Sequence, residues 1–298
     1  MFLSRMRFAR SVKIIGALLA TAALASCSTI KLAYNNLPEF TYWWLDGYVD
    51  FNGAQTPRTR DELTALLAWH RRNELPRLIA LVQKAEAMAP NDVTPAQVCA
   101  LADEVRARLV AVGEQAARPG TELAMSLGEA QLQTLAQKYA KNDAKFANDW
   151  VDRTPEQVHR KRYDDFLERN EDFYGPLDVE QRALMRRLTD QSLFDPKRVA
   201  AERRKRQAES IALLRQASTT AMAPNDVQRA IVAYVRRVAD PAPGPWRDYQ
   251  QALTQEGCSN VSIQHNAMRP AQRERAVQRL RAYRDDLRTL ALQDSGAP

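Results

Sequence analysis

The sequence predicts an all-α protein: a multi-helix bundle of antiparallel hairpins with one kinked long helix, behind an N-terminal signal segment. Three observations lead to this fold class. Only ten of the 298 residues are Gly, and the helix-favouring residues Ala, Leu, Arg, Gln and Glu are abundant. No alternating run rich in Val, Ile or Thr indicates a strand. Pro, Asn and Asp recur between periodic apolar stretches, where they end one helix and start the next.

The first 26 residues read as a signal peptide that is removed from the mature chain. Four basic residues, Arg5, Arg7, Arg10 and Lys13, precede a short apolar run from Ile14 to Ala25. The twelve residues of this run are too few to span a bilayer stably, and a charged start before such a run is typical of a signal peptide.

The run ends in Leu24-Ala25-Ser26-Cys27, which resembles the lipobox of bacterial lipoproteins. The resemblance implies that the chain is cut before Cys27 and that its thiol carries diacylglycerol, with palmitate-type acyl chains anchoring the protein to a membrane. Residues 27–37 would then form a lipid-anchored linker. Ser28 resembles the residue that, in enteric bacteria, directs lipoproteins to the outer membrane, facing the periplasm. The alternative is an ordinary cleaved signal peptide followed by a chance Cys.

Cleavage also changes what the charge implies. The signal segment carries four basic and no acidic side chains, so its removal lowers the formal net charge from +7 to +3. Much of the basic excess therefore belongs to the discarded segment, and nucleic acid is not expected as a partner.

Residues 38–293 are expected to form a single helical domain. Helices are predicted over residues 58–88, 95–117, 128–150, 155–174, 178–193, 196–220, 225–239, 246–265 and 270–292. Pro76 lies inside the first of these segments. Because proline removes a backbone donor and clashes with the preceding turn, that long helix should kink there.

A short segment before the first long helix is crowded with aromatic residues. Phe40, Trp44, Tyr48 and Phe51 are spaced by four, four and three residues, which predicts a helical stripe packed into the core. The alternative is an aromatic belt against the membrane beside the lipid anchor, because Trp and Tyr favour that zone.

One heptapeptide occurs twice. Residues 87–93 and 221–227 both read Ala-Met-Ala-Pro-Asn-Asp-Val, each between two predicted helices. Two related helical hairpins, over 58–117 and 196–239, would explain the repeat. Independent use of the same good connector is the alternative.

Four predicted helices open in a similar way, with a Gln near the third helical position: Thr94–Gln97, Thr154–Gln157, Asp178–Gln181 and Arg269–Gln272. This arrangement is typical of capping boxes, in which the cap and the Gln satisfy free backbone amides. The segments also resemble the L-T-x-x-Q motif of small helical periplasmic chaperones, although only Leu177 supplies the leading Leu.

Several segments together resemble a family of helical lipoproteins of unknown function from Gram-negative bacteria. The resemblance is carried by Tyr34–Pro38, Trp44–Asp46, Tyr48–Phe51, Trp69–Arg71 and Glu74–Pro76. It implies a helical fold and a place in the cell envelope, and it supplies no catalytic residues.

Two cysteines, Cys99 and Cys258, remain in the mature chain. An even number of thiols in an oxidising compartment favours one disulfide, whose loop closure would stabilise the fold by about 4 to 5 kcal/mol in the chain-entropy model. Two buried free thiols are the alternative.

No constellation in the sequence points to catalysis. The three histidines, His70, His159 and His265, fit no metal-ligand spacing, and there is no Walker loop, GxSxG or GxGxxG motif. His70 and Glu74 are one helical turn apart, which predicts a hydrogen bond on a helix surface. We expect no enzyme activity, no metal and no cofactor.

The densest charge is the run Arg203, Arg204, Lys205 and Arg206. A solvated helix face explains it most simply, and a patch that contacts anionic lipid or an acidic partner is the functional alternative.

The sequence thus predicts a non-enzymatic lipoprotein on the periplasmic face of the outer membrane, with an unknown envelope protein or anionic lipid as its partner. The alternative function is a periplasmic chaperone or foldase that holds unfolded client polypeptides between its helices. A concave face with exposed apolar stripes ringed by Arg would favour the chaperone.

Overall fold

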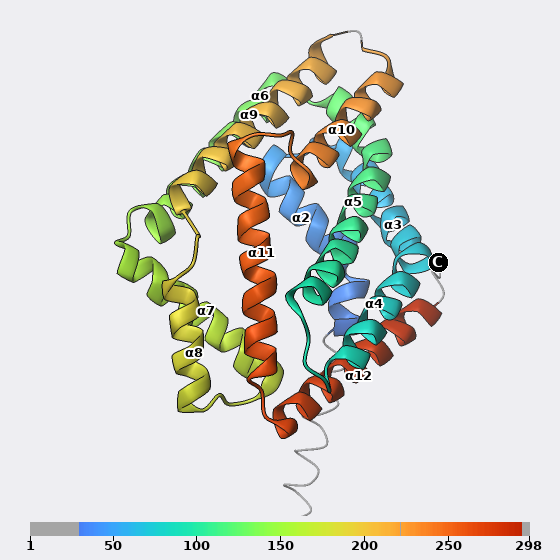
Figure 1. Ribbon diagram of the computed structural model, residues 1–298. Coiled ribbons are helices and arrows are strands. Elements are labelled where there is room, and N and C mark those ends of the chain that lie inside the picture. Colours follow the sequence, from blue (N-terminus) through green and yellow to red (C-terminus); the bar gives the residue numbers. More distant parts are fainter. Residues whose placement is uncertain (1–29, 221, 294–298) are drawn as a thin grey trace, which may run out of the picture.

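The computed structural model describes residues 30–220 and 222–293, and within them it contains helices and no strand (Figure 1). The all-α fold class is therefore confirmed. After a short helical stretch at residues 30–35, the elements are α2 (Leu37–Val49), α3 (Gln55–Asn73), α4 (Leu75–Met88), α5 (Pro95–Ser126), α6 (Glu129–Phe146), the π-helix η1 (Ala147–Val151), α7 (Pro155–Tyr174), α8 (Val179–Asp190), α9 (Pro196–Thr219), α10 (Pro224–Ala239), α11 (Pro245–Asn266) and α12 (Pro270–Leu292).

The predicted capping residues define the helix starts. The side chains of Thr94, Thr154 and Asp178 each accept a hydrogen bond from the backbone of the Gln three residues later, and each Gln side chain accepts from the cap amide. At Arg269 only the second half exists, because Arg offers no side-chain acceptor and the Gln272 side chain alone accepts from the Arg269 amide at 2.9 Å. Capping therefore accounts for the shared pattern.

Two prolines act differently from one another. The long helix expected from 58 to 88 is interrupted at Glu74, which separates α3 from α4, and Pro76 lies in the first turn of α4. The second predicted helix was expected to end at Ala117, and that boundary is wrong: α5 continues through Pro119 to Ser126. Because α5 packs against α3, α4, α9, α10 and α11, tertiary contacts outweigh the local cost of a proline in the helix interior.

Helix α5 lies at the centre of the arrangement in Figure 1, where α10 and α11 pack along it. Helix α4 pairs with α12, and α6 pairs with α9. Helices α7 and α8 form a hairpin that reaches the rest of the protein mainly through α11 and α12. A core under α2 forms around Tyr42, Phe51 and Leu132, and a second forms around Tyr174, Met185 and Ala276.

The two copies of the heptapeptide have different structures. In the first copy, α4 ends at Met88 and the remaining residues form a turn and an extended stretch before α5. In the second, Pro224 already starts α10, and Val227 is fully buried. Ala221 lies outside the described residues.

Candidate functional site

Helix α2 is apolar on two sides, and only one of them is covered by the protein. Tyr42 and Val49 are buried among neighbouring side chains, and α2 packs against α3 and α6. On the other side Phe40 is 58% exposed, and Trp43 and Trp44 are each 61% exposed. Together with Leu37 they share one helical face, which we call the aromatic face. A helix that is apolar all round normally has both sides covered, so this face is unusual for a protein surface.

The predicted core stripe is therefore partly wrong. Phe51 is buried and Tyr48 is half-buried, but Phe40 and Trp44 point outward. The side that faces the core carries Tyr42, whose ring stacks on Phe51 at 5.7 Å between centroids. Periodicity alone could not identify the covered side because both sides of α2 are apolar.

Behind α2 lies a cavity of about 570 Å³ that is open to the surface and lined by residues of α2, α5, α6, α9 and α10. We call it the α2 cavity. Its wall is mostly apolar. Leu123, Leu135, Leu213 and Ile231 are among the lining residues, and Trp44 lines it as well. Because Trp44 also belongs to the aromatic face, the cavity and this exposed surface are continuous. The volume falls in the range of small-molecule pockets, which are mostly apolar with a few polar groups.

The polar groups of the α2 cavity come largely from α9. Arg203 and Arg206 line it, whereas Arg204 and Lys205 between them are exposed and do not. The predicted basic patch is thus divided between two sides of one helix. This is expected, because residues three apart share a helix face and adjacent residues do not. Arg203 pairs with Asp143 at 3.4 Å and Arg206 with Glu202 at 2.8 Å.

Those ion pairs leave part of each guanidinium unsatisfied. Nε of Arg203 and Nη2 of Arg206 are buried and have no hydrogen-bond partner among the described residues. The indole Nε1 of Trp246 is in the same condition, and the Arg206 guanidinium lies 5.5 Å from the centre of that ring. Trp246 does not line the α2 cavity. A buried donor without a partner costs free energy, so the two unpaired guanidinium nitrogens of the cavity wall call for an acceptor.

The tyrosine hydroxyls of the cavity are, by contrast, all satisfied. Tyr48 accepts a hydrogen bond from Asn142 Nδ2 at 2.9 Å, and Tyr139 shares one with Ser210 at 3.2 Å. Tyr234 donates to the backbone oxygen of Arg206 at 3.0 Å, and burial raises the pKa of its hydroxyl. The unmet hydrogen-bonding capacity therefore belongs to nitrogen donors alone.

A second concave surface, which we call the α8 groove, lies between α7, α8 and α11, with a volume of about 520 Å³. Phe166, Phe173 and Leu253 contribute to its apolar lining, and Arg162 and Arg169 contribute charge. Burial lowers the pKa of Arg162, and Glu256, 3.9 Å away, opposes that effect. Sequence spacing gave no indication of this groove, because its residues come from three separate helices.

One side chain of the α8 groove is polar, buried and unpaired. Gln264 is only 7% exposed, and neither its amide nitrogen nor its amide oxygen has a partner among the described residues. Val261, one turn earlier on α11, is 52% exposed and also lines the groove. The groove therefore combines apolar walls, basic residues and an amide that can still donate and accept.

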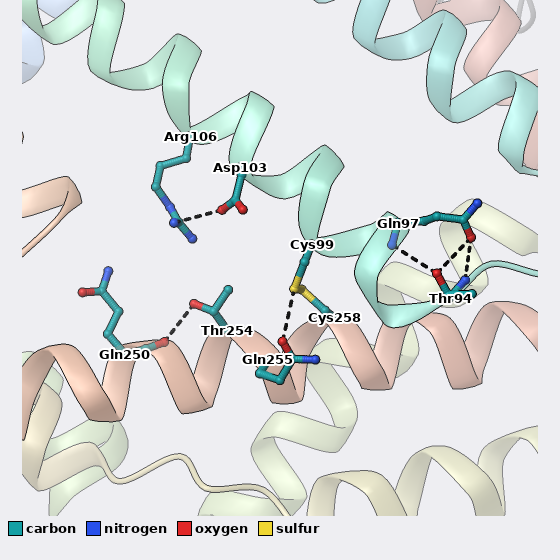
Figure 2. Close-up of a disulfide and its surroundings, with 9 residues drawn as sticks. All are labelled: Thr94, Gln97, Cys99, Asp103, Arg106, Gln250, Thr254, Gln255 and Cys258. Atoms are coloured by element: carbon teal, nitrogen blue, oxygen red, sulfur yellow. Dashed lines mark hydrogen bonds and ion pairs between the residues drawn. A yellow bond between two sulfur atoms is a disulfide. The ribbon is translucent and has the colours of Figure 1, made fainter.

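Cys99 of α5 and Cys258 of α11 form a disulfide in the structure, with their Cα atoms 5.3 Å apart (Figure 2). Cys258 is buried, whereas Cys99 is half-exposed near Gln255. The bond joins two helices that also pack side by side. Cys27, the predicted lipidation site, and the signal segment lie outside the described residues.

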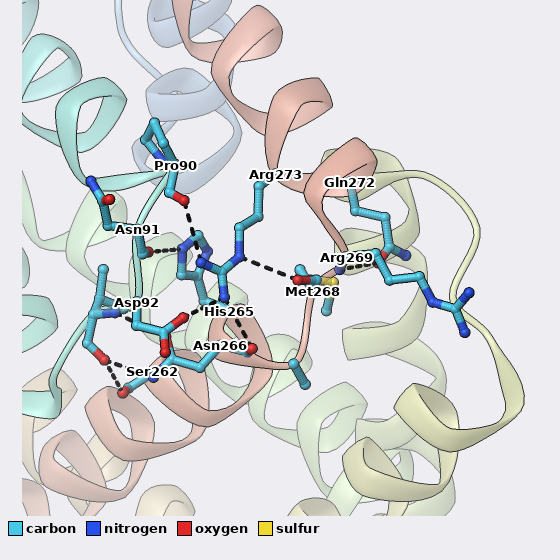
Figure 3. A network of polar contacts seen from close by, with 12 residues as sticks. Pro90, Asn91, Asp92, Ser262, His265, Asn266, Met268, Arg269, Gln272 and Arg273 are labelled. Atoms are coloured by element: carbon cyan, nitrogen blue, oxygen red, sulfur yellow. Dashed lines mark hydrogen bonds and ion pairs between the residues drawn. The ribbon is translucent and has the colours of Figure 1, made fainter.

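A polar network fixes the first heptapeptide copy to the end of α11 (Figure 3). Ser262 donates to the Val93 carbonyl at 2.6 Å, and Asn266 both donates to and accepts from the Val93 backbone. Nε2 of His265 lies 2.9 Å from the Asn91 carbonyl. We call these residues the α11 latch. Arg273 of α12 adds bonds to Pro90 and Asp92.

The predicted hydrogen bond between the side chains of His70 and Glu74 does not form. His70 Nδ1 lies 2.9 Å from the Tyr34 hydroxyl, and burial lowers the pKa of His70. Glu74 is buried and does not lie on the surface. Its carboxylate is 3.5 Å from Arg77 and 3.7 Å from Arg108. His70 therefore helps to attach the N-terminal segment, and burial raises the pKa of Tyr34 to about 12.

The described residues contain no group of three or more His, Cys, Asp or Glu side chains placed to hold a metal ion. Among the helices that can be described, none is long and apolar enough to span a bilayer.

A comparison with protein-family models matches residues 47–223, more than half of the chain, to a family of unknown function, DUF6279. The chain belongs to this family. The DUF6279 region begins within α2 and ends before α10, so it includes Tyr48 to Pro76 of the segments that carried the sequence resemblance. It contains Arg203, Arg206 and Cys99, whereas Cys258 lies beyond it. Searches of curated proteins and of solved structures gave no match.

Proposed function

We propose that this protein is a lipoprotein, anchored through acylated Cys27 to the periplasmic face of the outer membrane, where it serves as a non-enzymatic interaction module. The aromatic face is the observation that supports this proposal. It lies on the first long helix after Cys27, and it leaves two tryptophans and a phenylalanine uncovered. Tryptophan favours the zone between lipid headgroups and acyl chains. In the acylated protein, α2 would therefore lie against the membrane that holds the acyl chains.

Vesicle flotation tests the contribution of the aromatic face. The chain from residue 27 onward, carrying Cys27→Ser, keeps every described residue and lacks the acyl group. It should float with vesicles of phosphatidylethanolamine and phosphatidylglycerol. Trp43→Ser with Trp44→Ser should reduce the bound fraction several-fold, because membrane affinity scales with the buried apolar area.

The chain offers a matched control for this experiment. Val105 and Leu109 are 42% and 69% exposed on α5, so Val105→Ser with Leu109→Ser removes exposed apolar surface elsewhere. The control should bind vesicles like the parent chain. Equal loss in both double variants, or full binding without the tryptophans, would refute a specific role of α2.

The α8 groove favours the second candidate function, a chaperone for unfolded polypeptides. Its apolar wall and its two arginines are the features expected of a surface that holds apolar segments without regard to sequence. A peptide group carries one N–H and one C=O, which match the unpaired amide of Gln264.

Aggregation assays distinguish the two functions. As a chaperone, the chain from residue 27 with Cys27→Ser should suppress aggregation of several unrelated unfolded proteins, and salt should weaken the effect by screening the arginines. Val261→Glu should abolish suppression, whereas Val179→Glu, at an 84% exposed position that does not line the groove, should not. Absence of suppression at every salt concentration would exclude the chaperone function.

A further inference from the structure

We propose that the α2 cavity binds a fatty acid, with the acyl chain among the aliphatic side chains and the carboxylate at Arg203 and Arg206. This proposal goes beyond membrane anchoring and holds whether or not α2 touches a bilayer. It rests on three features: the chemistry of the wall, the unmet donors, and the route into the cavity.

The wall requires an apolar ligand body. Leu123, Leu135, Leu213 and Ile231 come from four different helices and leave a space of about 570 Å³ between them. Water gains few hydrogen bonds against such a wall, whereas each methylene transferred from water to it strengthens binding about fourfold. A single flexible acyl chain can follow an irregular aliphatic cavity.

The unmet donors require acceptor oxygens at one end of that ligand. Nε of Arg203 and Nη2 of Arg206 are buried without partners although both side chains line the cavity. A carboxylate has two oxygens and accepts only, so it matches a set that consists of donors only. Asp143 and Glu202 neutralise much of the guanidinium charge, and therefore we assign the head by hydrogen bonding rather than by net charge.

The route into the cavity passes the aromatic face. Trp44 lines the cavity and is 61% exposed, so the same ring belongs to the outer surface and to the wall. Lys138 lies 5.3 Å from the ring centre of Tyr48, which lines the cavity one turn after Trp44 along α2, and places a cation beside it. An amphiphile that adsorbs on the aromatic face could enter chain first along these side chains.

Displacement of the fluorescent fatty acid cis-parinarate from the chain starting at residue 27, with Cys27→Ser, tests the assignment. We expect saturable binding at one site, displaced by laurate and by palmitate. Palmitate should bind at least tenfold more tightly than laurate, because its four additional methylenes are buried. Absence of saturable binding, or equal affinity for the two acids, would overturn the proposal.

The basic run provides a matched pair of variants. Arg203→Gln with Arg206→Gln should weaken palmitate binding at least tenfold, because the carboxylate loses charge-assisted hydrogen bonds. Arg204→Gln with Lys205→Gln removes the same charge from the exposed side of α9 and should change affinity less than twofold. Equal weakening in both pairs would mean that binding is only a non-specific attraction to charge.

A third variant remains informative if removal of the inner arginines impairs folding. Leu213 lines the cavity but belongs to none of the buried core clusters, so Leu213→Trp should fill the space without disrupting them. It should abolish binding of cis-parinarate while circular dichroism shows an unchanged helical content. A folded Leu213→Trp variant that still binds with parental affinity would place the ligand elsewhere and refute the assignment. Preference for lysophosphatidylglycerol with no binding of either acid would refute the carboxylate head.

Discussion

The hydroxyl of Tyr174 lies 2.9 Å from Nδ1 of His265, which joins α7 to α11 across 91 residues of sequence. The other ring nitrogen of His265 faces the Asn91 carbonyl, which can only accept. Nε2 therefore carries the proton and donates to Asn91, and Nδ1 accepts from Tyr174. The imidazole of His265 in the α11 latch is therefore neutral. Burial favours this neutral form and lowers the pKa of His265.

This arrangement predicts that acid destabilises the fold. The pKa of His265 is lower in the folded chain than in the unfolded chain, so the unfolded state binds more protons as the pH falls. The stabilisation is complete above the unfolded value of about 6.5 and is lost progressively as the pH falls toward the folded pKa. Urea unfolding at pH 7.5 and pH 5.5 should show lower stability at pH 5.5.

Two variants separate the titration from the hydrogen bonds. His265→Gln should be less stable at pH 7.5 but should depend less on pH, with the remaining slope coming from His70, whose pKa burial also lowers. Tyr174→Phe removes one hydrogen bond, costs about 1 kcal/mol, and keeps the imidazole and its slope. An unchanged slope in His265→Gln would contradict the prediction.

The disulfide between Cys99 and Cys258 should stabilise the folded chain. Cys99→Ser with Cys258→Ser should lower the free energy of unfolding by about 2 to 5 kcal/mol, because the unfolded chain regains the entropy of a long open loop. Urea unfolding measures the difference. Mass spectrometry of the non-reduced, alkylated protein provides the control, since alkylation of both thiols would show that the bond does not form in the cell.

Gly175 should not tolerate a side chain. It ends α7 with φ of +84°, and a Cβ there would collide with the Arg275 guanidinium. Gly175→Ala should lower the free energy of unfolding by about 1 to 3 kcal/mol, because only glycine occupies this backbone region without strain. Gly257→Ala is the control: it lies inside α11 with open space around it, and should raise stability by about 0.5 to 1 kcal/mol. Equal stability of both variants would contradict the argument.

Cys27→Ser in the complete chain should release the protein from the outer membrane or block its processing, because the thiol that would carry the lipid is gone. Membrane fractionation followed by immunoblotting measures this. A variant that still fractionates with outer membranes at the parental level would contradict lipidation at Cys27.

The sequence is most informative about helix boundaries where local chemistry determines them. Thr94, Thr154 and Asp178 cap their helices as predicted, because a cap and its Gln interact within one turn. The predicted helix end at Ala117 is wrong because the contacts that keep α5 helical beyond this residue come from five other helices. Local patterns contain no information about such partners.

For the candidate sites, too, the sequence determines which residues share a helix face but not which helices meet. Helical periodicity could have placed Arg203 and Arg206 on one side and Arg204 and Lys205 on the other, since residues three apart share a face. It could not show that the inner pair meets Leu123, Leu135 and Ile231 in a cavity, because these residues are brought together only by the packing of α5, α6 and α10.

If the chain is tethered through Cys27, as proposed, the bond between Cys99 and Cys258 also has a mechanical consequence. If a partner bound to α12 pulls against the tether, tension passes from Cys99 directly to Cys258, and the chain between these two residues carries no load. Helices α12 and α4 pack against each other outside the covalent loop, so the tension falls on this contact. Most of the α2 cavity would keep its shape while the ends of the molecule extend. This part includes the Arg203–Arg206 run and the walls formed by α5, α6, α9 and α10.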